Sequence, residues 1–276
     1  MRRTPGTLMA MLVMLNALAA FAAESIFPDK NLETAVRKQV YEKRNNDEPI
    51  TADDVRHVSV IDGQGLGIKN LTGLENCRAL ASLDLTDNDI TNLSPLQNLK
   101  NLQSLTLAKN RIKNVSPLAG LQGLQYLNLT DNRVSDVSPL AQLTHLNSLY
   151  LTNNRIKDIT PLVHLQKLWS LYLGGNRLEK IQTLGKLHRV STLELSHCGL
   201  TGLSSLKGMN SLHLLLLQNN RINDLSPLVE MAHKDAQGPQ RFAPFLRVYL
   251  KGNPLGDDAK SRQIPALRKD GVKIHL

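Results

Sequence analysis

An internal period of 22 residues constrains this chain more than any other feature of its sequence. Asparagine recurs at that step, and a pair of leucines precedes each asparagine in the same register. The asparagines are Asn88, Asn110, Asn132, Asn154, Asn176 and, after Cys198 has taken one place, Asn220. Such a period is typical of stacked repeats, in which each unit buries its apolar edge against its neighbours.

The composition agrees with a stack. Only four Phe, one Trp and five Tyr occur among the 276 residues, whereas a globule of this length ordinarily draws much core volume from aromatic residues. An apolar share of 41% with 17 glycines excludes collagen-like and disordered chains. Leucine therefore fills a slot that has the same size in every layer.

Each unit has a readable local structure. Leu105 and Leu107 alternate with polar residues, which predicts a short strand with one buried side. The amide of Asn110 can both donate and accept, so stacked asparagines should form a ladder that satisfies buried backbone groups. Ser-Pro-Leu or Thr-Pro-Leu then predicts a helical turn, with the hydroxyl residue as its cap. These triplets occupy 94–96, 116–118, 138–140, 160–162 and 226–228.

The pattern from Leu102 to Ile112, Leu-x-x-Leu-x-Leu-x-x-Asn-x-Ile, resembles the leucine-rich repeat family over about residues 58–255. That family's pattern also allows Cys198 in the asparagine series. The preceding segment, with Ile26-Phe-Pro-Asp29 and Ile50-Thr-x-x-Asp54, looks like the cap of internalin-type bacterial proteins. The resemblance implies an α/β repeat solenoid: a horseshoe or arc with a parallel concave sheet, short 3-10 or helical convex turns and a helical N-terminal cap.

The first 22 residues predict a secretory signal peptide. Arg2 and Arg3 precede an apolar run, and Ala20-Phe21-Ala22 places cleavage after Ala22. The run is too short to span a bilayer. We therefore expect a secreted or periplasmic chain with no stable membrane insertion once the signal is removed.

The mature chain divides into three parts in this interpretation. Residues 23–57 form a helical cap, 58–255 form eight to nine repeats, and 256–276 form a C-terminal cap. An insertion interrupts the repeats at 229–244. It is either a structural transition toward the C-terminal cap or a protruding binding loop.

No constellation of residues points to catalysis. The sequence lacks HExxH, CxxC, a nucleophile elbow and a phosphate loop. Cys77 and Cys198 belong to repeats about five layers apart, too far for a disulfide at about 4.8 Å per layer. Both are expected to be buried and unpaired. We predict a non-enzymatic protein with no catalytic residues, metal or cofactor.

The residues beside the strand leucines should point off the concave face, and four of the five tyrosines lie there. Tyr, Trp and Arg are enriched at binding hot spots, and exposed apolar patches usually mark contacts. The predicted partner-binding residues are Tyr126, Tyr150, Trp169, Tyr172, Leu214, Leu216, Arg247 and Tyr249. They favour a protein partner on this face. The alternative is that stacked tyrosines only stabilise neighbouring strands.

A second column is basic. The residue after the asparagine is Arg111, Arg133, Arg155, Arg177 or Arg221. This strip is either a site for a polyanion, such as an acidic glycan, or a solvated edge paired with Asp136, Asp158 and Asp224. Aromatic residues are not interleaved there, so nucleic acid is not the expected partner. A purely structural envelope protein is the third interpretation.

Overall fold

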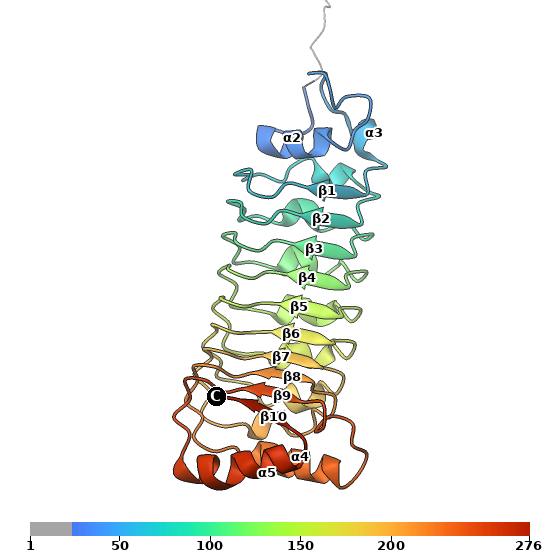
Figure 1. The fold of residues 1–276 in the computed structure, drawn as a ribbon. Coiled ribbons are helices and arrows are strands. Elements are labelled where there is room, and N and C mark those ends of the chain that lie inside the picture. The colour runs from blue at the N-terminus through green and yellow to red at the C-terminus, as the bar shows by residue number, and fades with distance from the viewer. Residues whose placement is uncertain (1–23) are drawn as a thin grey trace, which may run out of the picture.

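The computed structural model describes residues 24–276, which stack into one solenoid (Figure 1). Ten strands form one sheet in sequence order, each parallel to the next. They are β1 Val60–Asp62, β2 Ser82–Asp84, β3 Ser104–Thr106, β4 Tyr126–Asn128, β5 Ser148–Tyr150, β6 Ser170–Tyr172, β7 Thr192–Glu194, β8 Leu214–Leu216, β9 Arg247–Tyr249 and β10 Lys273–His275. The predicted fold class is therefore confirmed. The predicted signal peptide lies outside the described residues.

The 22-residue step sets the register of the sheet. Leu105 of β3 pairs with Leu127 of β4, which pairs in turn with Leu149 of β5. These leucines are fully buried, so each layer presents the same side chain to the next. Within residues 24–276, no helix has the length and apolar character needed to span a membrane.

The asparagines form the predicted ladder. The Oδ1 atom of Asn132 accepts from the N–H of Ile112 in the previous layer at 2.9 Å. Its Nδ2 atom donates to the carbonyls of Leu107 at 2.8 Å and Leu129 at 3.1 Å. The side chain is almost fully buried. One amide therefore satisfies backbone groups of two successive layers that would otherwise be buried without partners.

Short helical turns lie on the other side of the solenoid from the sheet (Figure 1). They are η1 Leu74–Asn76, η2 Ser94–Leu96, η3 Ser116–Leu118, η4 Ser138–Gln142, η5 Thr160–His164, η6 Leu184–Lys186 and η7 Ser204–Leu206. The prediction that serine or threonine caps these turns was wrong. In the Ser-Pro-Leu and Thr-Pro-Leu turns, the Asn or Asp two residues before the Ser or Thr accepts from its backbone N–H, as Asn92 does from Ser94 at 3.0 Å and Asp136 from Ser138 at 2.8 Å.

Two helices, α2 (Lys30–Arg37) and α3 (Ala52–Val55), cover the N-terminal end of the sheet (Figure 1). Asp29 caps α2 by accepting from the N–H groups of Asn31 and Leu32. Its other oxygen accepts from Lys69 at 2.8 Å and Asn70 at 3.0 Å. One carboxylate thus starts the helix and ties it to the first repeat.

The C-terminal end is closed by α4 (Ser226–Ala236), the wider turn η8 (Ala259–Gln263) and α5 (Ile264–Lys269). The insertion first lengthens the convex turn into α4 and then turns back at a buried aspartate. Asp235 accepts from the backbone N–H groups of Arg241, Phe242 and Ala243 at 2.9 to 3.1 Å. Phe242 is buried but Phe245 stays 57% exposed.

Asp29 makes the N-terminal cap sensitive to acid. Burial raises the pKa of its carboxyl, but the four backbone N–H donors outweigh burial and lower the pKa below 3.8. A lowered pKa means that the stabilisation is complete above about 3.8 and is lost as pH falls through the folded-state value. We expect Asp29→Asn to reduce the free energy of unfolding by about 1 kcal/mol at neutral pH, because an amide nitrogen cannot accept from the N–H groups of Lys69 and Asn70.

Urea denaturation at about pH 7 and about pH 3 measures this effect. The difference between wild type and variant should shrink at the lower pH, which lies below the ordinary pKa of 3.8, because the unfolded chain then binds a proton at Asp29 and part of the stabilisation is lost. Asp47→Asn, an exposed aspartate of the same cap, is the control. A deficit that is the same at both pH values would contradict the role of the charge.

Candidate binding surface

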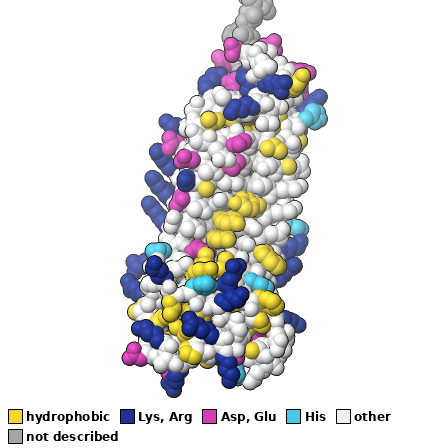
Figure 2. All heavy atoms as spheres, in the orientation of Figure 1, with side chains coloured by type: hydrophobic (Ala, Val, Ile, Leu, Met, Phe, Trp, Pro, Cys, Tyr) yellow, Lys and Arg dark blue, Asp and Glu magenta, His cyan; other side chains and the backbone are white. Residues whose placement is uncertain are grey.

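The concave face carries the predicted columns of side chains. Figure 2 shows a group of hydrophobic side chains over the middle strands, surrounded by mostly uncharged surface. Tyr126 of β4, Tyr150 of β5 and Tyr172 of β6 belong to the columns of the concave face and are half-buried. Toward the C-terminal end, Leu214 and Leu216 of β8 are also half-buried. These residues share one face because each precedes or follows a buried leucine of its strand.

The three tyrosines form a continuous stack. The ring centroids of Tyr150 and Tyr172 lie 4.5 Å apart with nearly parallel planes, and those of Tyr126 and Tyr150 lie 5.3 Å apart at 42°. Burial, and then the neighbouring phenol of Tyr150, raises the pKa of Tyr126 and of Tyr172. Both hydroxyls therefore stay protonated at neutral pH and can donate hydrogen bonds to a partner.

The other predicted residues lie apart from this stack. Tyr249 stacks on His275 of β10, with ring centroids 4.3 Å apart, and is separated from Tyr172 by two strands. Arg247 is exposed at the start of β9. Trp169 is 55% exposed and directly precedes β6. The structure thus divides the predicted residues into the tyrosine stack, the pair Leu214 and Leu216, and three flanking residues. The flanking residues are Trp169, Arg247 and Tyr249.

Glu194 lies between Leu193 and Leu195, a position expected to point off the concave face, but its side chain is almost fully buried. Its carboxylate accepts from the N–H of Gly174 at 2.6 Å and from the N–H of Ser196 at 2.9 Å. A β-carbon added to Gly174 would lie 2.2 Å from this carboxylate, so glycine leaves the space that the acid occupies. The face between Tyr172 and Leu216 is therefore not interrupted by an exposed charge.

A pair of aromatic rings on the margin was not predicted. His213 and Phe245 stack with ring centroids 5.8 Å apart, and His213 also contacts the hydroxyl of Ser191 at 3.1 Å. His213 occupies the same place in its repeat as Trp169 does two repeats earlier. Comparing the residues directly before each strand would have identified His213. Phe245 could not be identified in this way, because it follows the insertion and does not fit the 22-residue period.

The five arginines of the basic strip are all exposed. Figure 2 shows Lys and Arg side chains along one margin of the solenoid. The pairing predicted with Asp136, Asp158 and Asp224 was wrong, because those aspartates cap the convex turns. Within residues 24–276, only Arg111 of the strip forms an ion pair, at 2.6 Å from Asp89.

Cys198 interrupts the ladder and opens a groove. In regular repeats the ladder asparagine accepts from the residue 20 positions earlier, as Asn176 does from Ile156. A thiol cannot replace that acceptor, and Leu178 donates instead to the carbonyl of Asn176. The chain that follows moves toward the previous layer, where the N–H groups of Glu179 and Lys180 donate to Lys157.

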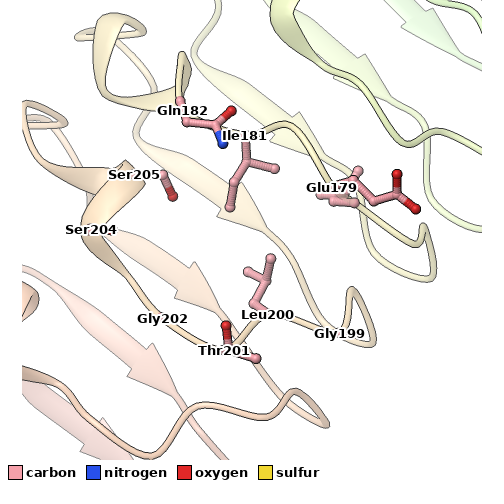
Figure 3. A pocket seen from close by; sticks show the side chains of 10 residues that line it. Glu179, Ile181, Gln182, Gly199, Leu200, Thr201, Gly202, Ser204 and Ser205 are labelled. Carbon is pink, nitrogen blue, oxygen red and sulfur yellow. The ribbon is translucent and has the colours of Figure 1, made fainter.

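The groove lies between this segment and residues 199–205 of the next layer, and it has a volume of about 420 Å³ (Figure 3). Ile181 and Leu200 point toward one another across it, and Glu179 points away. Gly199 and Gly202 lie on the same side of the groove as Leu200, and a β-carbon on either would meet no atom within 4 Å. The repeat pattern allows Cys198 in place of asparagine. The structure shows that the ladder then lacks one Oδ1 acceptor at this position.

The described part of the chain holds no cluster of His, Cys, Asp or Glu with the geometry of a metal site. Cys77 and Cys198 are both buried and free, as predicted. Burial raises the pKa of each thiol to about 12. Neither side chain is available as a thiolate nucleophile at neutral pH.

The fold and this face together define a leucine-rich repeat solenoid, a protein-interaction module. The family models described as "Leucine Rich repeats (2 copies)" and "Leucine rich repeat" match residues 122–164 and 78–134. No curated protein matches the chain.

The chain is similar to the crystal structure of internalin C2 from Listeria monocytogenes, with 34% identity and a TM-score of 0.71. That match covers 77% of this chain and 96% of the other. Internalin F of the same organism matches at 23% identity and a TM-score of 0.49, over 94% of this chain and 95% of the other. The chain belongs to the bacterial internalin-like leucine-rich repeat proteins.

The ladder break can be repaired by one substitution. We expect Cys198→Asn to offer the N–H of Leu178 a ladder acceptor in place of the carbonyl of Asn176, and to raise the free energy of unfolding by about 1 kcal/mol. Urea denaturation measures the change, with Cys77→Leu as a control because Cys77 occupies a leucine position away from the ladder. A variant no more stable than wild type would contradict the proposed cause of the groove.

Proposed function

We propose that this protein binds another protein through the half of its concave face that extends from β4 to β9. The observation that supports this most directly is the tyrosine stack of Tyr126, Tyr150 and Tyr172, continued by Leu214 and Leu216. Large aromatic side chains on a rigid sheet lose little conformational freedom on binding. Such residues commonly supply most of the energy of an interface.

Two observations favour this half of the face over the other. The N-terminal strands present small polar residues, such as Ser82, Ser104 and Thr106. Glu194, the acid closest to the tyrosines in their column, is buried and bonded to backbone, so it adds no exposed charge to the patch. Stacking between the tyrosines also stabilises adjacent strands, and this contribution is compatible with binding.

Site-specific crosslinking tests the proposal. A photo-crosslinking residue at position 150 should capture a defined partner from the native extracytoplasmic fraction. The same residue at His164, on the convex turn of the same layer, should not capture it. Equal capture at both positions would argue against the concave face.

The isolated partner then allows the affinity to be measured. Replacing Tyr150, Tyr172 and Leu216 together with serine should weaken binding by about 100-fold or more, the scale of losing hot-spot residues. Circular dichroism checks that the variant stays folded. Unchanged affinity in a folded variant would be evidence that the tyrosines serve the sheet alone.

A second candidate function is polyanion binding by the basic strip. It is favoured by the absence of ion pairs at Arg133, Arg155, Arg177 and Arg221 within residues 24–276. Affinity for a sulfated glycan such as heparin should fall steeply with salt and with Arg133→Ala plus Arg155→Ala. Binding that is insensitive to both changes would exclude the strip.

Export is part of the same proposal. The basic start, the short apolar run and the small residues before position 23 support a cleaved signal peptide. A secreted or periplasmic location would place the concave face where extracytoplasmic partners are found.

A further inference from the structure

An open groove of about 610 Å³ lies beside the concave face, where β2 to β5 begin, and we call it the strand-start groove. Four carboxamide side chains line it: Asn101, Gln103, Gln122 and Gln125. The remaining side chains in its lining belong to two alanines, one lysine and one histidine, and none is a carboxylate. In Figure 2 the surface on the side of the central hydrophobic group away from the margin of Lys and Arg side chains is mostly uncharged.

One position in the lining of the groove carries no side chain. Gly123 stands at the position that Asn101 fills one repeat earlier and His145 one repeat later. A β-carbon on Gly123 would lie 3.1 Å from the carbonyl oxygen of Lys100 and 3.3 Å from that of Leu102. The neighbouring layer therefore packs closely against this glycine.

The carboxamides are free to bind. Gln103, Gln122 and Gln125 are exposed, and no group of residues 24–276 forms a hydrogen bond with their side chains. The Nδ2 atom of Asn101 donates to the carbonyl of Arg78 at 2.8 Å, which leaves its Oδ1 atom available. A carboxamide both donates and accepts. It is therefore matched to a ligand whose hydroxyl groups also do both.

An aromatic ring lies at the end of the same column. Gln103, Gln125, Asn147 and Trp169 follow one another at 22-residue steps. The backbone N–H of each donates to the carbonyl of the one before, at 2.8 to 2.9 Å. The column is three strand spacings long, about 14 Å. Trp169 is 55% exposed, so its face is open to a planar or ring-shaped apolar surface.

We propose that the strand-start groove, together with the column that continues from it, binds an uncharged oligosaccharide. Gln103 and Gln125 in the groove and Asn147 beyond it would bond to hydroxyl groups, and Trp169 at the end of the column would stack on one sugar ring. A polyanion would need more than the one lysine and one histidine that line the groove. An extended peptide would need apolar pockets for its side chains, and no lining side chain that is purely apolar is larger than alanine. This site is separate from the tyrosine stack, although Trp169 borders both.

Calorimetric titration of the folded protein with chitohexaose and cellohexaose tests the proposal, with a heparin hexasaccharide as the charged comparison. Saturable binding of at least one uncharged hexasaccharide is expected. Gln103→Ala combined with Gln125→Ala should weaken it about tenfold, the effect of losing two hydrogen bonds. Trp169→Ala should weaken it as well.

The matched control removes two exposed glutamines of the convex turns, Gln97→Ala with Gln142→Ala, and should bind as wild type does. Tyr150→Ser should also leave saccharide binding unchanged, which separates this site from the proposed protein interface. The proposal is overturned if neither uncharged saccharide binds at millimolar concentration, or if the Gln103 and Gln125 variant binds like wild type. Binding of only the sulfated saccharide, or only of extended peptides, would overturn it too.

Discussion

The structure depends on how backbone groups are satisfied in the turn that follows each strand. Those groups are buried between layers, so water cannot reach them, and an unpaired buried amide costs about 1 to 3 kcal/mol. Each ladder asparagine resolves this for two layers at once, as Asn132 does for Ile112 of the previous layer and Leu129 of its own. Strands of three residues are sufficient because the ladder, rather than a long sheet edge, fixes the spacing between repeats.

The binding surfaces follow from this spacing. A fixed step between layers places equivalent residues in straight columns, so a few substitutions in one column create a continuous surface. Tyr150 and Tyr172 stack because they are equivalent residues on adjacent strands. Gln103, Gln125 and Trp169 are aligned by the same rule on the margin. One scaffold can therefore present different chemistry on its face, its two margins and its grooves.

Much of this arrangement could be predicted from the sequence, because identical layers make every column visible as a period. The buried leucines, the ladder, the convex turns and the exposure of the arginines all follow from it. The period could not predict the conformation of a side chain or its hydrogen-bond partners. Glu194 occupies an outward position, yet its carboxylate folds back to the N–H of Gly174. Asp136 lies near the arginines in sequence but caps a turn instead.

Local breaks in the period were the hardest to predict. Cys198 fits the volume of the asparagine slot, so the pattern tolerates it, but the slot also requires an acceptor that a thiol lacks. The rearrangement at Leu178 and Lys180 is a consequence of hydrogen bonding, which a volume-based pattern does not contain. Phe245 stacks on His213 only because the insertion displaces it from the repeat register.

Amide hydrogen exchange of the native protein tests the central role of the ladder most directly, because it reports the protection of single N–H groups. The N–H groups of Ile90, Ile112, Val134 and Ile156 each donate to a ladder asparagine and should exchange slowly and at similar rates. The N–H of Leu178 donates instead to the carbonyl of Asn176 within its own turn, outside the ladder, and should exchange markedly faster. Equal protection at Leu178 and at the other four positions would contradict the account.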